Sequence, residues 1–421
     1  MTRYDVTKYG IIGDGETNNT ALIKKLIESL KEKGGTVYFP KGKYVTGTIT
    51  LYSNMSLYLE DGCEILASSD IKDYQKIQLD GYTRGGFSGI VTAYNAENIT
   101  IEGSGKIDGR GYNWWKSMPS DLLRPRTINP ILCKNVEIKD ITVVNSPCWT
   151  VHPMCCENVV IDSVKVINPY DSPNTDGINP ESCKNVTIKN CYIDVGDDCV
   201  TLKSGTETDL LQKRYPCENI TVTSCVMAHG HGGLVIGSEM SGGVKNVTVS
   251  NCIFKNTDRG IRIKTRRKRG GFVENINISD ITMDNIMAAF TINEFYRCGA
   301  DLNDPDLPNP EKLTPDEATP RIQGITLDKA VCRNVRGVGI YINGLPEMPV
   351  RDITIKNIDM EITGTQKGIE PIMAFERLRS YGEGIYLKNA STVNISDIGI
   401  SCPKEKITVI QCENVDVKEK Y

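Results

Sequence analysis

Short stretches of alternating apolar and polar residues run through most of the chain, and one motif recurs among them. An Asn is followed by Ile or Val, then by one variable residue, then by another Ile or Val. Alternation of this kind is typical of a strand with one buried face. The motif begins at Asn98, Asn135, Asn158, Asn185, Asn219, Asn246 and Asn275. A repeat of about 20–50 residues is typical of a solenoid or a propeller.

The repeats favour a solenoid of strands over the other repeat architectures. Each repeat consists of a strand, a turn and a second short strand, with almost no helical pattern, which argues against helical solenoids. The spacing varies between 23 and 37 residues, whereas propeller blades are more regular. Asn at a fixed turn suits the left-handed conformation and can bond to its counterpart in the next coil. We therefore predict an all-β chain folded as a single-stranded parallel β-helix.

The remaining segments predict one cap and two loops on a single domain spanning 1–421. Apolar residues at helical spacing predict an amphipathic helix over 18–33, which can cap the open first coil. Irregular sequence at 70–89 and Pro-rich sequence at 297–320 predict loops that project from the coils. Three further strands are expected, at 36–39, 47–51 and 55–59.

Composition limits the classes of partner. The net charge of −4 gives no general attraction for nucleic acid or membrane, so neither is an expected partner. The sequence contains no apolar run of signal-peptide or membrane-span length, and we therefore expect a cytoplasmic location unless a signal has been removed. Several of the 15 cysteines stand at matching repeat positions, which favours buried thiols and a reducing compartment. The pattern makes no prediction about oligomeric state.

Four polar clusters interrupt the repeats at intervals of about one coil. They are Asn174–Gly177 (Asn-Thr-Asp-Gly), Gly196–Asp198 (Gly-Asp-Asp), Gly230–Gly232 (Gly-His-Gly) and Arg262–Lys264 (Arg-Ile-Lys). Neighbouring strands of a sheet lie about 4.8 Å apart. Clusters on successive coils are therefore expected to lie side by side in one groove.

Three aspartates in these clusters are candidate catalytic groups: Asp176, Asp197 and Asp198. Two carboxyl groups that flank a glycosidic bond can hydrolyse it, because one protonates the leaving oxygen and the other activates water. The Asn-Thr-Asp-Gly cluster or the Gly-Asp-Asp cluster alone would indicate an ordinary turn, but their placement one coil apart favours a catalytic site.

The remaining candidates are a histidine with its glycine and a set of cations. His231 and Gly232 lie in a glycine-rich stretch, where the backbone can approach a ligand closely. No carboxylate or cysteine stands at metal-ligand spacing beside them, and neither a metal nor another cofactor is expected. Alternation places Arg262 and Lys264 on one face of a strand, where they can bind a carboxylate. Lys203 and the basic run 266–269 are expected to assist, with Arg267 and Lys268 of the run exposed to solvent.

In their order and spacing, the four clusters resemble the signature of glycoside hydrolase family 28, the polygalacturonases. The similarity extends from about Tyr4 to the C-terminus. It implies a right-handed β-helix and inverting hydrolysis of α-1,4 bonds between galacturonic acid units of pectic oligo- or polysaccharides. By motif position it implies Asp197 as general acid, Asp176 and Asp198 as the groups that activate water, and His231 as a residue that tunes the acid. Substrate binding would fall to Asn174, Gly232, Arg262 and Lys264, with Tyr296 in the following coil.

Finer points of activity stay open at this stage. A histidine in the third cluster favours homogalacturonan over rhamnogalacturonan, and the two predicted loops favour an exo-acting enzyme. The alternatives are a rhamnogalacturonan hydrolase of the same family and a pectate lyase with the same fold. A β-helix that binds polysaccharide without cleaving it is a third alternative, which the converging carboxylates disfavour.

Overall fold

The structure is a computed structural model that describes residues 2–82, 85–118 and 123–420. The chain forms two compact units, residues 1–197 with 209–212 and residues 198–208 with 213–421. Each unit is built from short parallel strands that follow one another in successive coils. Both have the predicted right-handed parallel β-helix architecture, so the predicted fold class is confirmed.

The first unit contains the capping helix and short strands. Its helices are η1 (Val6–Tyr9), α1 (Thr20–Leu30), η2 (Ile71–Asp73) and α2 (Tyr112–Trp115). Its strands are β1 (Arg3–Asp5), β2 (Asp14–Asn18), β3 (Gly35–Phe39), β4 (Gly42–Thr46), β5 (Ile49–Leu51), β6 (Met55–Leu59), β7 (Cys63–Ala67), β8 (Val91–Tyr94), β9 (Glu97–Gly103), β10 (Lys106–Asp108), β11 (Ile128–Ile131), β12 (Lys134–Lys139), β13 (Thr142–Val144), β14 (Glu157–Asp162), β15 (Lys165–Ile167), β16 (Lys184–Lys189) and β17 (Tyr192–Asp194).

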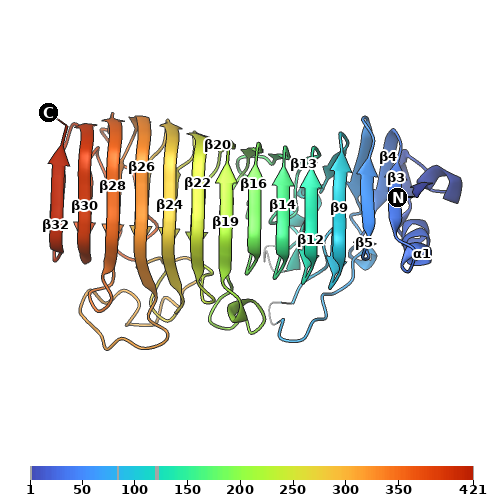
Figure 1. Cartoon of the computed structure of the whole chain (residues 1–421), viewed down its shortest axis with the longest axis horizontal. Helices are drawn as coiled ribbons and strands as arrows, with labels where there is room; N and C mark the ends of the chain where they lie inside the picture. The colour runs from blue at the N-terminus through green and yellow to red at the C-terminus, as the bar shows by residue number, and fades with distance from the viewer. Residues whose placement is uncertain (1, 83–84, 119–122, 421) are drawn as a thin grey trace. The chain divides into compact units, whose positions relative to one another are not determined.

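Strands of the first unit form parallel ladders along the coils. One ladder runs β1–β3–β6–β9–β12–β14–β16, a second runs β2–β4–β7–β10–β13–β15–β17, and a third runs β5–β8–β11. The adjacent arrows β9, β12 and β14 in Figure 1 belong to the first ladder. The strand register places buried side chains opposite one another: Val136 lies opposite Val159, and Val159 lies opposite Val186. The apolar positions of the repeat therefore stack into a continuous core.

The Asn of each repeat occupies the turn predicted for it. Asn98, Asn135 and Asn158 have φ values between 55° and 59°, in the left-handed region. Each side-chain amide donates to the preceding Asn of the stack, at 2.9 Å from Asn135 to Asn98 and 3.0 Å from Asn158 to Asn135. In the second unit Asn275 donates to Asn246 at 2.7 Å. The motif therefore holds the turns of neighbouring coils together.

The second unit contains longer strands. They are β18 (Asp198–Leu202), β19 (Cys217–Thr223), β20 (Val226–His229), β21 (Gly232–Gly237), β22 (Val244–Lys255), β23 (Arg259–Lys264), β24 (Phe272–Asp284), β25 (Ala288–Asn293), β26 (Arg321–Val335), β27 (Val338–Asn343), β28 (Val350–Ile362), β29 (Ile385–Lys388), β30 (Ala390–Ser401), β31 (Ile407–Ile410) and β32 (Glu413–Glu419). The short helix η4 spans Gln212–Arg214.

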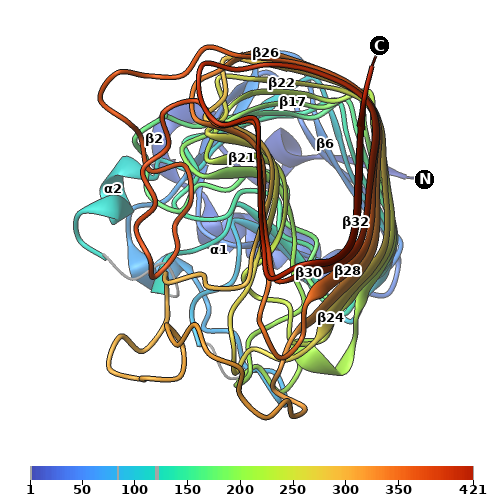
Figure 2. The same cartoon turned by 90° about the vertical axis from the view of Figure 1, so that its left-hand side faces the viewer.

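Two ladders organise the second unit. Strands β19, β22, β24, β26, β28, β30 and β32 pair in parallel, and β18, β21, β23, β25, β27, β29 and β31 form the other ladder. Seen end-on in Figure 2, β28, β30 and β32 follow nearly the same bent course. Because consecutive coils superimpose, residues at one position of the repeat fall in a row along the ladder. The second of these ladders carries the polar cluster residues of this unit.

A helix and two largely irregular segments occupy the positions for which the sequence predicts a cap and loops. Helix α1 is shorter at both ends than the predicted 18–33, and Ile23, Leu26, Ile27 and Leu30 form its buried side. The loop 297–320 contains no helix or strand and projects from the strands of the second unit (Figure 1, light orange). The loop 70–89 contains η2 and a bridge between Lys76 and Phe87, while its residues Thr83 and Arg84 lie outside the described residues.

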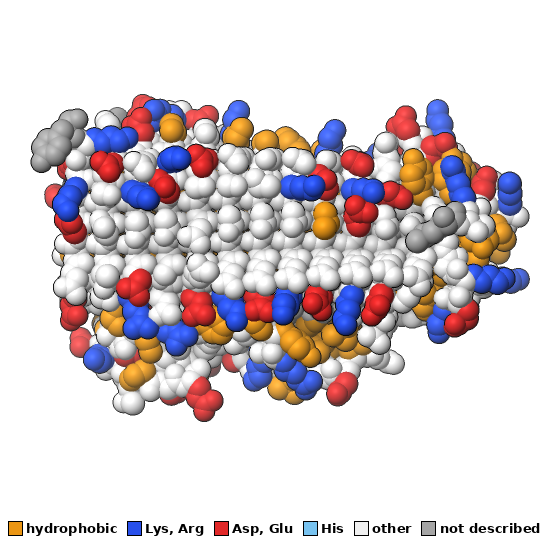
Figure 3. Space-filling view, viewed as in Figure 1, with side chains coloured by type: hydrophobic (Ala, Val, Ile, Leu, Met, Phe, Trp, Pro, Cys, Tyr) orange, Lys and Arg blue, Asp and Glu red, His pale blue; other side chains and the backbone are white. Residues whose placement is uncertain are grey.

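Exposed strand faces carry charges of both signs. Lys and Arg side chains alternate with Asp and Glu side chains over the strands in Figure 3. Ion pairs on these faces include Lys139–Glu102 at 3.3 Å in the first unit and Lys245–Glu218 at 3.1 Å in the second. These outer faces therefore neutralise their own charge. In the described part of the chain, no helix combines the length and apolar character needed to cross a membrane.

Candidate active site

Asp198 is the centre of a charged cluster in the second unit. It is the first residue of β18, and only 1% of its side chain is exposed. Arg262 Nη1 donates to Asp198 Oδ1 at 3.1 Å, and Lys264 Nζ donates to Asp198 Oδ2 at 2.6 Å. Each carboxylate oxygen therefore has its own cationic partner.

Strand register explains why these residues meet. Strands β18, β21 and β23 are neighbours, and Asp198 lies opposite Gly232 while Val235 lies opposite Arg262. Arg262 and Lys264 point to the same face of β23, and Ile263 between them enters the core. The alternation in the sequence therefore correctly predicts the direction of both cations.

Gly232 provides the close approach that the sequence suggested. A Cβ atom at this position would lie 3.1 Å from Asp198 Oδ1 and 2.4 Å from Val235 Cγ2. A larger residue would thus displace the carboxylate from its cations or shift the strand. Its neighbour His231 is exposed to solvent. Its charge is close enough to contribute to lowering the pKa of Asp198.

The electrostatics of Asp198 identify its working protonation state. Burial alone would raise the pKa of this carboxyl group, but the charges of Lys264 and Arg262 outweigh burial and hold the pKa well below its usual range. Asp198 is therefore ionised throughout the physiological pH range. Such a group can accept a proton from water, but it has none to donate to a leaving group.

Tyr296, which the family resemblance suggests as a substrate-binding residue, lies beside both cations of the cluster. Its ring lies over both cations, with the ring centre 5.5 Å from Arg262 Cζ and 5.3 Å from Lys264 Nζ. The face of an aromatic ring attracts cations. Burial raises the pKa of the Tyr296 phenol, so the hydroxyl keeps its proton. The second unit thus brings together Asp198, His231, Gly232, Arg262, Lys264 and Tyr296.

In the first unit, the Asn-Thr-Asp cluster lies against the turn that precedes Asp197. The Gly196 N–H donates to Thr175 Oγ1 at 3.2 Å, and Thr175 Oγ1 contacts Ser172 Oγ at 2.6 Å. Asp176 is buried, and Asn179 Nδ2 donates to its Oδ2 at 2.9 Å. Asp197 is partly exposed. The two turns that carry Asp176 and Asp197 are therefore tied together by the backbone and by Thr175.

Arg124 is a member of this arrangement that the sequence did not reveal. Its side chain is fully buried, and its guanidinium donates to Pro147 O at 2.8 Å, to Pro173 O at 2.9 Å and to Asn174 Oδ1 at 2.7 Å. Asn174 itself has a φ of 57°. Arg124 therefore fixes both the backbone and the side chain of the Asn-Thr-Asp turn. Arg124 follows residues outside the described part and belongs to no motif, so no sequence pattern indicates its role.

The remaining predicted cations are already engaged within the protein. Lys203 is 4% exposed and its Nζ donates to Glu239 at 2.8 Å. The expectation of solvent exposure is wrong for Arg267, which is 4% exposed, and right for Lys268, which is 50% exposed. Arg266 and Arg269 both contact Glu207, at 3.1 and 2.7 Å, and Arg267 contacts Glu347 at 2.6 Å. These arginines are buried because their carboxylate partners and the 297–320 loop cover them.

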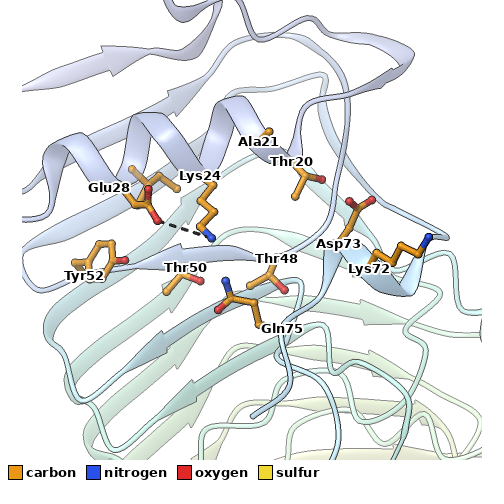
Figure 4. Close-up of a pocket in the computed structure, with 11 residues that line it drawn as sticks. Thr20, Ala21, Lys24, Glu28, Thr48, Thr50, Tyr52, Lys72, Asp73 and Gln75 are labelled. Atoms are coloured by element: carbon orange, nitrogen blue, oxygen red, sulfur yellow. Dashed lines mark ion pairs between the residues drawn. The ribbon is translucent and has the colours of Figure 1, made fainter. Parts of the chain in front are cut away.

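Each unit contains a cavity. In the first unit a cleft of about 440 Å³ separates α1 from β5 and η2, with Lys24, Tyr52 and Lys72 on its walls (Figure 4). None of the predicted site residues is among the described residues that line it. In the second unit a cavity of about 10 Å³ is lined by Arg262, Lys264 and Tyr296. Within the described ranges, no three His, Cys, Asp or Glu side chains gather closely enough to hold a metal ion.

Comparison with known proteins agrees with this arrangement. The family model of glycosyl hydrolases family 28 matches residues 62–377. A relative from Vitis vinifera, named "Probable polygalacturonase", is 33% identical over 378 residues, which cover 86% of this chain and 74% of the relative. The crystal structure of a hyperthermoactive exopolygalacturonase from Thermotoga maritima superimposes with a TM-score of 0.78 at 28% identity, covering 98% of this chain and 92% of that one.

A second solved structure supports the fold. The family 28 exopolygalacturonase of Yersinia enterocolitica superimposes with a TM-score of 0.81 at 21% identity, over 100% of this chain and 79% of that one. Because the family model covers most of the chain and includes all four polar clusters, the chain belongs to glycosyl hydrolases family 28.

Proposed function

We propose that this enzyme hydrolyses α-1,4 bonds between galacturonic acid units, with inversion at the anomeric carbon. The observation that carries the proposal is the Asp198–Arg262–Lys264 cluster, in which an ionised carboxylate lies beside two cations. The cluster combines a base for water with a binding site for the carboxylate of an acidic sugar. Membership of family 28 and the polygalacturonase names of the relatives support the same substrate.

In this proposal the two adjacent aspartates have different roles. Asp198 is held ionised and, together with Asp176, deprotonates the attacking water. Asp197 is partly exposed and protonates the leaving oxygen, while His231 tunes that acid. Arg262 and Lys264 carry two positive charges against the single charge of Asp198, which leaves a net attraction for the substrate carboxylate. Tyr296 holds the two cations from the other side.

We further propose that the enzyme is exo-acting. In the first unit, the paired side chains of Thr92 on β8 and Asn129 on β11 point away from the core and are nevertheless covered, since each is 2% exposed. The loop 70–89 packs its apolar residues, including Ile77 and Leu79, against Ile131. Because these side chains are covered, a long polysaccharide cannot bind along β8 and β11. The name of the Thermotoga maritima relative, an exopolygalacturonase, supports this mode.

Product analysis on polygalacturonate tests the function. Hydrolysis should release monomeric galacturonate from the start of digestion, and NMR should show the β anomer first, because the α bond is inverted. A rapid fall in viscosity with a ladder of oligomers would show an endo-acting enzyme. An unsaturated product that absorbs ultraviolet light would show a lyase, and release of product only from rhamnogalacturonan would support the other alternative.

Replacement of the proposed acid tests the assignment of roles. Asp197→Asn should lower kcat by about 10²–10⁴-fold, the usual contribution of a positioned general acid. Thermal unfolding should change little, because Asp197 is partly exposed. Asp194→Asn, on β17 of the same coil, is the matched control and should keep wild-type activity. Wild-type kcat in Asp197→Asn would exclude Asp197 as the acid.

A further inference from the structure

A segment of the second unit lies across the charged cluster. Residues 369–380 leave the coil between β28 and β29 and return to their starting point, where Ile369 and Ser380 pair through backbone hydrogen bonds of 2.9 and 2.7 Å. We call this segment the strap; it lies within the dark orange loop at the left of Figure 2. No pattern in the sequence distinguished it from an ordinary loop.

Backbone contacts fix the strap next to Tyr296. The Phe375 N–H donates to Phe295 O at 3.0 Å, and the Arg297 N–H donates to Met373 O at 3.2 Å. Arg259, itself 5% exposed, donates from Nε to Pro371 O at 2.5 Å. The strap is therefore attached on both sides of Tyr296 and along β23.

The strap closes the space around the anion-binding cations. Arg262 Nη2 donates to Met373 Sδ at 3.0 Å, and Pro371, Ile372 and Met373 form one wall of the small cavity that Arg262 lines. As a result Arg262 is 5% exposed and Tyr296 is 7% exposed. A sugar carboxylate can reach Arg262 only from the side that the strap leaves open.

Beyond the cluster, the row of outward residues changes from polar to apolar. Thr291 of β25 lies opposite Tyr341 of β27, which in turn lies opposite Tyr386 of β29. The two tyrosine rings stack with their centres 5.1 Å apart. The strap residues Ile372, Ala374, Phe375 and Leu378 pack with them in one apolar cluster.

An acidic saccharide cannot continue over this part of the ladder. Each further galacturonate would place a carboxylate against apolar side chains, where an uncompensated charge is strongly unfavourable. The cations of this region stand beside the row and not in it. Lys388 of β29 lies opposite Asn343, and Arg377 and Arg379 of the strap are exposed to solvent. The strap is held in place, because its backbone is hydrogen-bonded to Phe295 and Arg297 and its side chains pack against aromatic rings.

We propose that the strap ends the saccharide-binding row at Arg262 and Tyr296, and that the enzyme therefore prefers short galacturonides to the polymer. This inference rests on the proposed galacturonide hydrolase activity. It adds a specificity element, with Pro371 and Met373 forming part of the wall of the cavity that Arg262 lines.

The test is a series of substrates of increasing length. Values of kcat/KM, expressed per chain end, should be highest for di- or trigalacturonate and at least about tenfold lower for hexagalacturonate and polygalacturonate, since extra acidic sugars meet the apolar wall. Failure to hydrolyse any galacturonide would refute the proposed function itself. Hydrolysis of all lengths with equal kcat/KM would leave that function intact and overturn the inference about the strap.

Two variants assign the preference to the strap. Because Ile369 and Ser380 already pair like the ends of a hairpin, residues 370–379 can be replaced by Asn-Gly, which favours a tight hairpin turn. This variant should reduce the difference between hexa- and digalacturonate to less than about threefold, because it removes the strap side chains of the apolar cluster that the additional sugars would meet. Met373→Ala changes only the wall beside Arg262 and should reduce the difference between hexa- and digalacturonate kcat/KM by a smaller amount.

Met287→Ala is the matched control. Met287 is a half-buried methionine of the same unit that does not line the cavity, so the length preference of wild type should persist. Thermal unfolding identifies any variant that fails to fold, and Met373→Ala then decides the question. An unchanged ratio of hexa- to digalacturonate kcat/KM in folded Met373→Ala and in the shortened variant would overturn the proposal.

Discussion

Arg262 and Arg267 lie five residues apart and look alike by every local measure. Their side chains are 5% and 4% exposed, and each contacts a buried carboxylate, Asp198 for Arg262 and Glu347 for Arg267. Their surroundings differ. Arg262 shares the single charge of Asp198 with Lys264, so its cluster has more positive than negative charge. Arg262 also lines a cavity. Arg267 has Glu347 to itself and is surrounded by backbone oxygens.

Arg267 binds the protein's own loop. Besides its two bonds to Glu347, it donates to Asp306 O at 2.8 Å, Asn309 O at 2.5 Å and Glu311 O at 3.0 Å. These bonds use the donors of the guanidinium and hold the 297–320 loop. The comparison shows that a buried arginine is a candidate for substrate binding when its charge is incompletely balanced, and a structural clamp when carboxylate and carbonyl groups surround it.

The largest expected effect is on stability and concerns the clamp. Arg267→Ala leaves Glu347 buried without its partner, and breaking a buried ion pair in this way costs about 3–5 kcal/mol. Denaturant unfolding should show this loss, and limited proteolysis should cut within 297–320. Arg267→Lys is the control that keeps the charge but loses the paired geometry. An unchanged unfolding midpoint in Arg267→Ala would show that the loop does not depend on the clamp.

The next effect is on catalysis and concerns the proposed binding site. Arg262→Ala should lower kcat/KM on galacturonides by about 10–150-fold, since a hydrogen bond to a charged group contributes about 1.5–3 kcal/mol. On fully methyl-esterified substrate, kcat/KM should differ little between wild type and Arg262→Ala, because esterification has already removed the carboxylate charge. If Arg262→Ala and Arg267→Ala reduced kcat/KM equally after correction for the folded fraction, the distinction between the two arginines would be wrong.

Near neutral pH, a pH effect on stability should arise beside the clamp, at Glu294. Glu294 is buried, accepts from the Leu345 N–H at 3.0 Å, and faces Glu347 and Arg267. Burial, reinforced by Glu347, raises the pKa of Glu294 from 4.5 to about 8, against the lowering effects of the Leu345 N–H and Arg267. The folded state therefore keeps a proton that the unfolded state loses, so stability should fall as pH rises from about 4.5 to 8.

Glu294→Gln tests this pH dependence, because the amide does not titrate. Thermal unfolding measured between pH 5 and 8 should show a smaller decline for Glu294→Gln than for wild type. Glu361→Gln, at an exposed position of β28, should retain the wild-type decline. Equal declines in wild type and Glu294→Gln would show that Glu294 is already ionised at pH 5.

The smallest effect concerns the exposed end of the basic run. Lys268 is 50% exposed and contacts Asp304 at 2.6 Å and Asp306 at 2.9 Å. Exposed pairs contribute about 0.2–1 kcal/mol and are screened by salt. Lys268→Ala should lower the unfolding free energy by that amount at low salt and by less at 0.5 M salt. A loss that persists at high salt would place Lys268 with the buried clamp.

Local sequence determined the coil and the direction of the motif side chains. The alternation of Ile or Val with polar residues decides which side chains enter the core, and Asn accepts the left-handed turn that each coil needs. The same alternation places Arg262 and Lys264 on one face of β23. These features depend on positions two residues apart or on one repeat, so they can be read along the chain.

Tertiary structure decided which charges are neutralised and where the ligand surface ends. The partners of Arg267 stand 39 to 80 residues away, and Met373 stands 111 residues from Arg262. Arg124 reaches Asn174 across 50 residues without any motif. Such contacts follow from where irregular loops return to the coil. The sequence reveals that a loop exists by its Pro and Gly content, but its path depends on packing against distant side chains, which no local pattern records.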